Sequence, residues 1–173
     1  MLPSLDSVLK TTNLTKSIFH VTANDNRQRL LSFPVGTYRT SLIPLEQITE
    51  ILRLNLDDIL SVPETPGSIL GVYNWRGEML WLVDLEQLIG GTSLFEQVPL
   101  SKPPIAIVLQ VASYYFGLVV KSVNEIELHD LNKLLPAKPG SLPPQLLPFV
   151  IGYLPNSSTV LNPTAIAQFF LQG

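Results

Sequence analysis

The chain has no cysteine among its 173 residues, and it carries few charges. Without cysteine it cannot have a disulfide scaffold, a thiol nucleophile, or cysteine-ligated zinc and iron–sulfur sites. Charged residues make up 14% of the sequence, against about 25% in an average soluble protein. The eleven basic residues form no block and are outnumbered by fourteen acidic ones. We therefore expect no nucleic-acid partner.

Long uninterrupted apolar runs are also missing. The longest uncharged apolar stretch before the C-terminal tail, residues 103–120, contains two prolines, Gln110 and Gly117. It is shorter than the roughly 20 apolar residues that a membrane-spanning helix needs. Residues 1–20 carry three charges and no continuous apolar segment, so they do not read as a secretory signal. We expect a cytoplasmic protein without direct membrane insertion.

No residue pattern indicates catalysis. His20 and His129 lack the spacing of a metal site. The serine of the 67–71 segment is misplaced for a nucleophile elbow. Asp57 and Asp58 are adjacent, so in a strand they would face opposite ways. We therefore expect a protein that is not an enzyme and has neither cofactor nor metal.

The most informative feature is an internal repeat, which predicts a duplicated architecture. Residues 30–51 align without gaps over residues 105–126. The matched positions are Ile43 with Leu118, Leu45 with Val120, Ile48 with Val123, Glu50 with Glu125 and Ile51 with Ile126. Further on, residues 69–74 resemble 150–156 and residues 82–84 resemble 160–162, each followed by a helical pattern. Chance similarity of apolar runs would not readily repeat these features in the same order.

The sequence of each half predicts mainly β-strands. Residues 30–35 and 39–45 flank a Gly36-Thr37 turn, and residues 105–111 and 114–120 flank Ala112-Ser113, so each pair predicts a hairpin. Residues 48–60 also fit a helical face. We interpret them, and their counterpart at 123–128, as strands.

Two short helices have clear start signals. Asp84 precedes the first, and its carboxylate can accept the N–H of Gln87, while Gly90 or Gly91 can end the helix. Asn162 precedes the second, expected at 163–171, with Pro163 at the first helical position. Asp84 and Asn162 are therefore predicted structural caps.

One polar cluster, residues 74–78, interrupts the apolar background between Gly71 and the next strand. Gly77 predicts a tight turn that would project Arg76 beside Trp75, and both residue types are enriched at binding hot spots. The alternative is that Arg76 pairs with Glu78 or Asp84 and only fixes the turn. The low charge content also permits a barrel that binds a small apolar ligand between the two halves.

A set of short motifs lies at 47–51, 61–63, 69–78 and 82–85 in the first half, and at 107–109, 117–120 and 123–126 in the second. In these segments the sequence resembles the CheW-like family of bacterial chemotaxis coupling proteins. The Asn-x-Arg-Gly and Val-Asp-Leu motifs, at 74–77 and 83–85, are the most specific. Trp75 replaces the usual leucine, Lys121 stands where the family has aspartate, and Asn162 replaces a common aspartate.

The resemblance implies a mainly β fold of two intertwined, five-stranded SH3-like barrels with a few short helices. It implies a tail at 1–29 and a CheW-like domain at 30–170, with a first barrel at about 30–95, a second at about 103–160 and a final helix at about 163–171. The implied function is a non-catalytic adaptor that joins methyl-accepting chemoreceptor tips to the regulatory domain of a CheA-type histidine kinase, in chemotaxis, phototaxis or twitching motility. A scaffold repurposed outside chemotaxis is the other reading of the resemblance. The implied partner-binding residues are Ile48, Glu50, Gly71, Asn74, Trp75 and Arg76.

Overall fold

The computed structural model describes residues 25–37, 39–96 and 102–172, which form ten strands and two α-helices. The strands are β1 (Arg27–Val35), β2 (Arg39–Pro44), β3 (Ile48–Arg53), β4 (Ile69–Trp75), β5 (Glu78–Asp84), β6 (Ile105–Val111), β7 (Tyr114–Val120), β8 (Ile126–Asp130), β9 (Val150–Tyr153) and β10 (Thr159–Leu161). The helices are α3 (Leu85–Leu88) and α4 (Pro163–Leu171). Short 3-10 turns cover Leu45–Gln47, Leu56–Asp58, Leu94–Glu96, Leu131–Lys133 and Leu147–Phe149.

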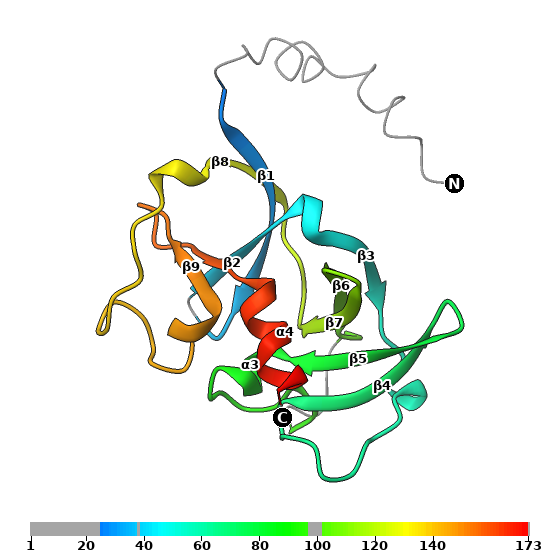
Figure 1. Cartoon of the computed structure of the whole chain (residues 1–173). Coiled ribbons are helices and arrows are strands. Elements are labelled where there is room, and N and C mark those ends of the chain that lie inside the picture. The colour runs from blue at the N-terminus through cyan, green and yellow to red at the C-terminus, as the bar shows by residue number, and fades with distance from the viewer. Residues whose placement is uncertain (1–24, 38, 97–101, 173) are drawn as a thin grey trace, which may run out of the picture.

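The strands form two five-stranded sheets, as the expected mainly β, SH3-like fold requires (Figure 1). Sheet 1 has the order β8-β1-β2-β10-β9, and sheet 2 has the order β3-β6-β7-β5-β4. Each sheet therefore combines two strands from one half of the chain with three from the other. The expected barrel boundaries, 30–95 and 103–160, match the two halves of the sequence repeat. They do not match the two sheets, because each sheet takes strands from both halves. The expected tail at 1–29 is three residues too long, because β1 begins at Arg27.

The two sheets are related by the sequence repeat. Replacing each strand of sheet 1 by its counterpart in the other half gives the order of sheet 2. The halves join through four strand pairs: β2 with β10 and β5 with β7 are parallel, and β1 with β8 and β3 with β6 are antiparallel. Parallel neighbours cannot be joined by a tight hairpin, so these strands come from distant parts of the chain.

The ungapped repeat alignment is wrong by one residue in the first strand of each half. Leu31 pairs with Ile43 in sheet 1, and Ile107 pairs with Leu118 in sheet 2, and all four face the same core. Ile43 and Leu118 are 75 positions apart, whereas Leu31 and Ile107 are 76 apart. The loop of the first hairpin is one residue longer, which shifts β1 relative to β6.

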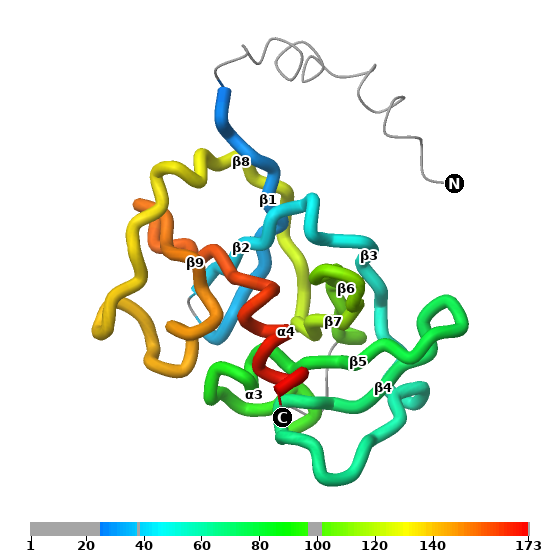
Figure 2. The backbone as a smooth tube through the Cα atoms, in the orientation of Figure 1, coloured from blue at the N-terminus to red at the C-terminus, as the bar shows by residue number. Residues whose placement is uncertain are grey.

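Three apolar clusters hold the sheets together. The largest lies between the sheets, includes Phe33, Phe116 and Leu118, and is covered by α4 through Ile166 and Ala167. Figures 1 and 2 show α4 lying across the front of both sheets. A second cluster packs on the other face of sheet 2, which the sheet curls around. A smaller cluster packs on the corresponding face of sheet 1. Strands that bury side chains on both faces explain the near-continuous apolar runs of the sequence.

Each sheet is curled by one close backbone approach at a glycine. In sheet 2, where β3 and β4 are opposite edges, the chain after β3 returns so that Leu60 pairs with Val72 of β4. A Cβ on Gly71 would lie 2.1 Å from the Leu60 carbonyl oxygen, and its φ of +139° suits only glycine. In sheet 1, a Cβ on Gly152 would lie 2.6 Å from the carbonyl oxygen of the equivalent Leu135.

The strand expected at 48–60 is shorter in the structure. β3 ends at Arg53, because Asn55 accepts a hydrogen bond from the Asp57 N–H (3.2 Å) and starts a 3-10 turn. Its counterpart, β8, begins at Ile126 rather than at residue 123. The β1–β2 and β6–β7 hairpins pair in register on either side of their predicted turns.

Both helix starts have the capping geometry that the sequence indicates. The Asp84 carboxylate accepts the Gln87 N–H at 3.3 Å, and the Asn162 side chain accepts the Ala165 N–H at 3.3 Å. Asp84 is fully buried and also accepts bonds from the Ser93 hydroxyl (3.0 Å) and the Leu94 N–H (2.9 Å). These donors satisfy a buried carboxylate that would otherwise be costly.

Candidate functional site

A tight turn places Arg76 at one end of sheet 2. The last pair of the β4–β5 hairpin is Trp75 with Glu78, so Arg76 and Gly77 alone form the turn. Their φ angles are +53° and +78°, the sign that a type I′ turn requires at both positions. Asn74 stabilises the turn by accepting the Gly77 N–H at 3.1 Å. The turn projects at the right of Figures 1 and 2, past β3.

One carboxylate oxygen of Glu50 in β3 binds both Trp75, the last residue of β4, and Arg76 of the turn. The Trp75 indole N–H donates to Glu50 Oε2 at 2.7 Å, and the Arg76 guanidinium contacts the same oxygen at 3.1 Å. The guanidinium also lies 4.8 Å from the centroid of the Trp75 ring, within cation–π range. The Trp75 ring in turn packs on Tyr115 of β7, with centroids 5.2 Å apart. We call Glu50, Trp75, Arg76 and Tyr115 the Arg76 cluster.

The side chains of the Arg76 cluster become more exposed from Trp75 to Glu50 to Arg76. Trp75 is only 7% exposed, whereas the Glu50 side chain is 34% exposed and that of Arg76 is 64% exposed. An exposed ion pair contributes about 0–1 kcal/mol, so the pair does little for stability. Its effect is geometric, because it holds one edge of the guanidinium while the other donors stay available. Arg76 thus forms its ion pair with Glu50. The alternative prediction from the sequence, an ion pair with Glu78 or Asp84, is wrong.

The other predicted site residues lie apart from the cluster. Ile48 is half-buried and packs against the core between the sheets. Gly71 is buried beneath the Leu60 backbone, so it shapes sheet 2 without offering a side chain. Only Glu50, Trp75 and Arg76 come together, with Asn74 in the supporting turn.

An exposed apolar strip adjoins the Arg76 turn. The parallel pairing of β5 with β7 sets Trp81 beside Phe116, and the same register places Met79 beside Tyr114, two residues closer to the turns. All four side chains share the face that forms the core between the sheets. Helix α4 covers this face as far as Phe116, where the Phe170 ring packs at 5.2 Å.

Beyond this cover, Met79 is 69% exposed and Tyr114 is 58% exposed. We call Met79, Trp81 and Tyr114 the apolar strip. The sequence reading missed these residues, although the alternation Met79, Trp81, Val83 already indicated one continuous apolar face.

The Arg76 cluster has no counterpart at the equivalent place in sheet 1. The β9–β10 hairpin is shorter, and Leu154 and Ser158 bond across its loop instead of a two-residue turn. Glu125, the counterpart of Glu50, bonds through its backbone to Ser32 of β1. The two sheets are therefore similar in topology but differ at this end.

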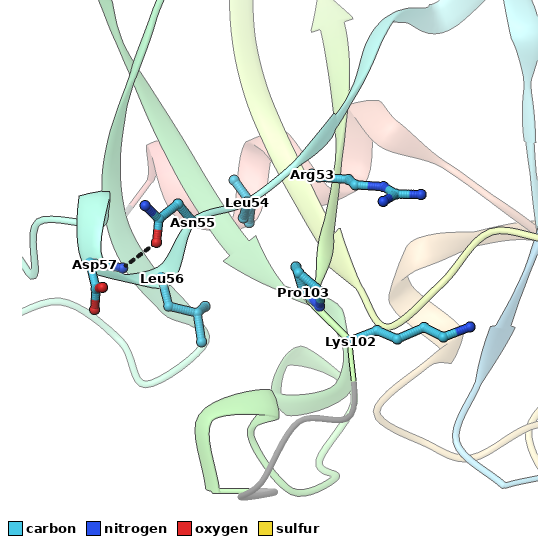
Figure 3. Close-up of a pocket in the computed structure, with 7 residues that line it drawn as sticks. All are labelled: Arg53, Leu54, Asn55, Leu56, Asp57, Lys102 and Pro103. Carbon is cyan, nitrogen blue, oxygen red and sulfur yellow. Dashed lines mark hydrogen bonds between the residues drawn. The ribbon is translucent and has the colours of Figure 1, made fainter.

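Sites of other kinds receive little support. Within the described residues, no group of three or more His, Asp or Glu side chains is placed to hold a metal ion. His129 bonds to Glu127 at 2.6 Å, and the described hydrogen bonds include none from His129 to a serine hydroxyl. An open depression of about 580 Å³ is lined by Arg53–Asp57, at and after the end of β3, and by Lys102 and Pro103, just before β6 (Figure 3). It is not the closed cavity between the halves that a small apolar ligand would need.

Comparison with known proteins identifies the family to which this chain belongs. The sequence model of the CheW-like domain matches residues 29–161, most of the chain, and the chain belongs to this family. A comparison with curated proteins finds no match.

Among solved structures, the fold is similar to that of the scaffolding protein TtCheW from Thermoanaerobacter tengcongensis. The TM-score is 0.63 with 22% sequence identity, over 78% of this chain and 87% of that one. No helix in the described part of the chain is long and apolar enough to cross a membrane.

Proposed function

We propose that this protein is a non-catalytic cytoplasmic adaptor that couples methyl-accepting chemoreceptors to a CheA-type histidine kinase, in chemotaxis, phototaxis or twitching motility. Family membership supports the class of function. The observation that carries the proposal for this chain is the Arg76 cluster together with the apolar strip at the same end of sheet 2. The Trp75 ring lies on one face of the sheet and the strip, which α4 leaves uncovered, on the other, so this end presents an anchored cation and exposed apolar surface.

This pairing of features suits the tip of a receptor, which is a helical hairpin. An amphipathic helix docks by laying its apolar stripe on an exposed apolar surface. Met79 and Tyr114 offer such a surface, and Arg76 can bind a carboxylate beside the stripe. A charged contact of this kind sets the register and the choice of partner more than the raw affinity.

The test is a calorimetric titration of the full chain with two partners from the same genome, a receptor-tip fragment and the regulatory domain of the kinase. We expect binding of both by the wild-type protein. Arg76→Ala should weaken the receptor titration by about 2 kcal/mol, roughly thirtyfold, and lower the melting temperature little because the ion pair is exposed.

Lys133→Ala is the matched control, since it removes an exposed positive charge from sheet 1. It should leave both titrations unchanged. Failure of the wild-type protein to bind either partner would refute the adaptor role. A large melting shift for Arg76→Ala with intact binding would instead make the turn a purely structural feature.

A further inference from the structure

A second surface lies on sheet 2 at the end away from the Arg76 cluster. The open depression there has apolar side chains, Leu54, Leu56 and Pro103, between two cations on one side and Asp57 on the other. Figure 3 shows the Arg53 and Lys102 side chains extending in the same direction, away from Asp57. At about 580 Å³ it has the size of a binding pocket, but it is open to solvent.

The walls of this depression are fixed before any partner arrives. The Leu54 N–H donates to the Pro104 carbonyl at 3.0 Å, which ties the end of β3 to the segment before β6. Two consecutive prolines, Pro103 and Pro104, restrict that segment. On the other side, Asn55 holds the 3-10 turn at 56–58 through the Asp57 N–H. A preformed surface loses less conformational entropy on binding.

The cations of the depression are not compensated within the described chain. Arg53 and Lys102 are exposed and, like most of the described lysines and arginines, make no ion pair with any described residue. Asp57 is the one acidic residue of the lining, so the depression carries a small excess of positive charge in a chain whose net charge is −3.

We propose that the depression binds an acidic, leucine-containing segment of a partner protein. The apolar side chain of such a segment would cover Leu56 and Pro103, while flanking Asp or Glu residues would contact Arg53 and Lys102. Charge complementarity favours this occupant over a basic one, and the open shape favours a peptide over an enclosed small ligand. The inference does not depend on the adaptor role, because it uses the opposite end of sheet 2.

The probe is a labelled synthetic peptide, Gly-Glu-Glu-Leu-Glu-Glu-Gly, titrated into the full chain and followed by fluorescence anisotropy. We expect saturable binding that weakens as salt is raised from about 50 to about 200 mM, because salt screens exposed charges. The same peptide with lysine in place of glutamate should not bind. Arg53→Glu and Lys102→Glu should each weaken binding by about tenfold or more, equal to about 1.4 kcal/mol.

Lys133→Glu makes the same change in net charge on sheet 1 and should alter the affinity less than about twofold, a surface effect of a few tenths of a kcal/mol. All three lysine or arginine positions are exposed, so melting temperatures should report that each variant is folded. The proposal is overturned if the wild-type chain does not bind the acidic peptide. It is also overturned if the lysine peptide binds equally, or if Lys133→Glu weakens binding as much as Arg53→Glu does.

Discussion

The indole N–H of Trp75 offers the sharpest test of the Arg76 cluster. Trp75→Phe keeps an aromatic ring but removes the donor that reaches Glu50 at 2.7 Å. A hydrogen bond to a charged group contributes about 1.5–3 kcal/mol. Because Glu50 is 34% exposed and water can partly replace the lost donor, we expect a loss of about 1–2 kcal/mol from this bond.

A control must remove the effect of the smaller ring. Trp81→Phe makes the same ring contraction at a half-buried position where the indole N–H makes no hydrogen bond to a described residue. The free energy of unfolding, measured by urea denaturation, should therefore fall by about 1–2 kcal/mol more for Trp75→Phe than for Trp81→Phe. For a chain of this size that difference corresponds to a melting temperature about 2–8 °C lower.

Equal losses for the two variants would refute the reasoning, since the Glu50 contact would then contribute nothing. The receptor titration gives an independent readout, because a freed Glu50 and a smaller ring restrain Arg76 less. We expect Trp75→Phe to weaken receptor binding severalfold and Glu50→Gln, which keeps an acceptor for Trp75, to weaken it less than Arg76→Ala does.

Three further substitutions test the fold and the apolar strip. Gly71→Ala should lower the free energy of unfolding by more than about 3 kcal/mol, because its Cβ would lie 2.1 Å from the Leu60 oxygen. The control Gly36→Ala, at φ +63° with open space around it, should lower it by only about 1–2 kcal/mol. Similar losses for the two variants in chemical denaturation would contradict this prediction. Ile166→Ala, in the fully buried face of α4, should cost about 2–5 kcal/mol; an unchanged denaturation midpoint would mean that α4 does not hold the sheets. Met79→Glu, at a position 69% exposed, should leave the melting temperature unchanged and weaken receptor binding at least tenfold, about 1.4 kcal/mol; full binding would exclude the apolar strip from the interface.

Local signals in the sequence predicted the hairpins, the helix starts and the repeat. Turn residues, a cap before each helix and alternating apolar positions act over a few residues, so they can be read directly. The end of β3 was missed because Asn55 stops the strand through its side chain, while the apolar residues spaced along 48–60 continue past it. The single-residue shift of β1 was missed because the extra loop residue leaves no mark on the apolar pattern.

Long-range pairing could not be predicted in the same way. Alternation tells which side chains are buried but not which strand lies alongside, so the joining of β2 with β10 and of β5 with β7 is invisible in the sequence. The candidate site shows the same limit. Glu50, Trp75 and Arg76 were named, but their contact depends on the curling of sheet 2, which sets the two ends of its strand order together.

Strand exchange between the halves has a consequence for how this chain could have arisen and how it can be taken apart. Neither half contains a complete sheet, so neither is expected to fold alone. Halves cut between residues 96 and 102 should instead reassemble when produced together, each supplying the missing strands of the other. A chain of half this length could build the same pair of sheets only as a symmetric dimer, with identical turns at both ends. A single chain is free of that constraint, so the turn at Arg76 can occur once, while its counterpart at 154–158 takes a different form.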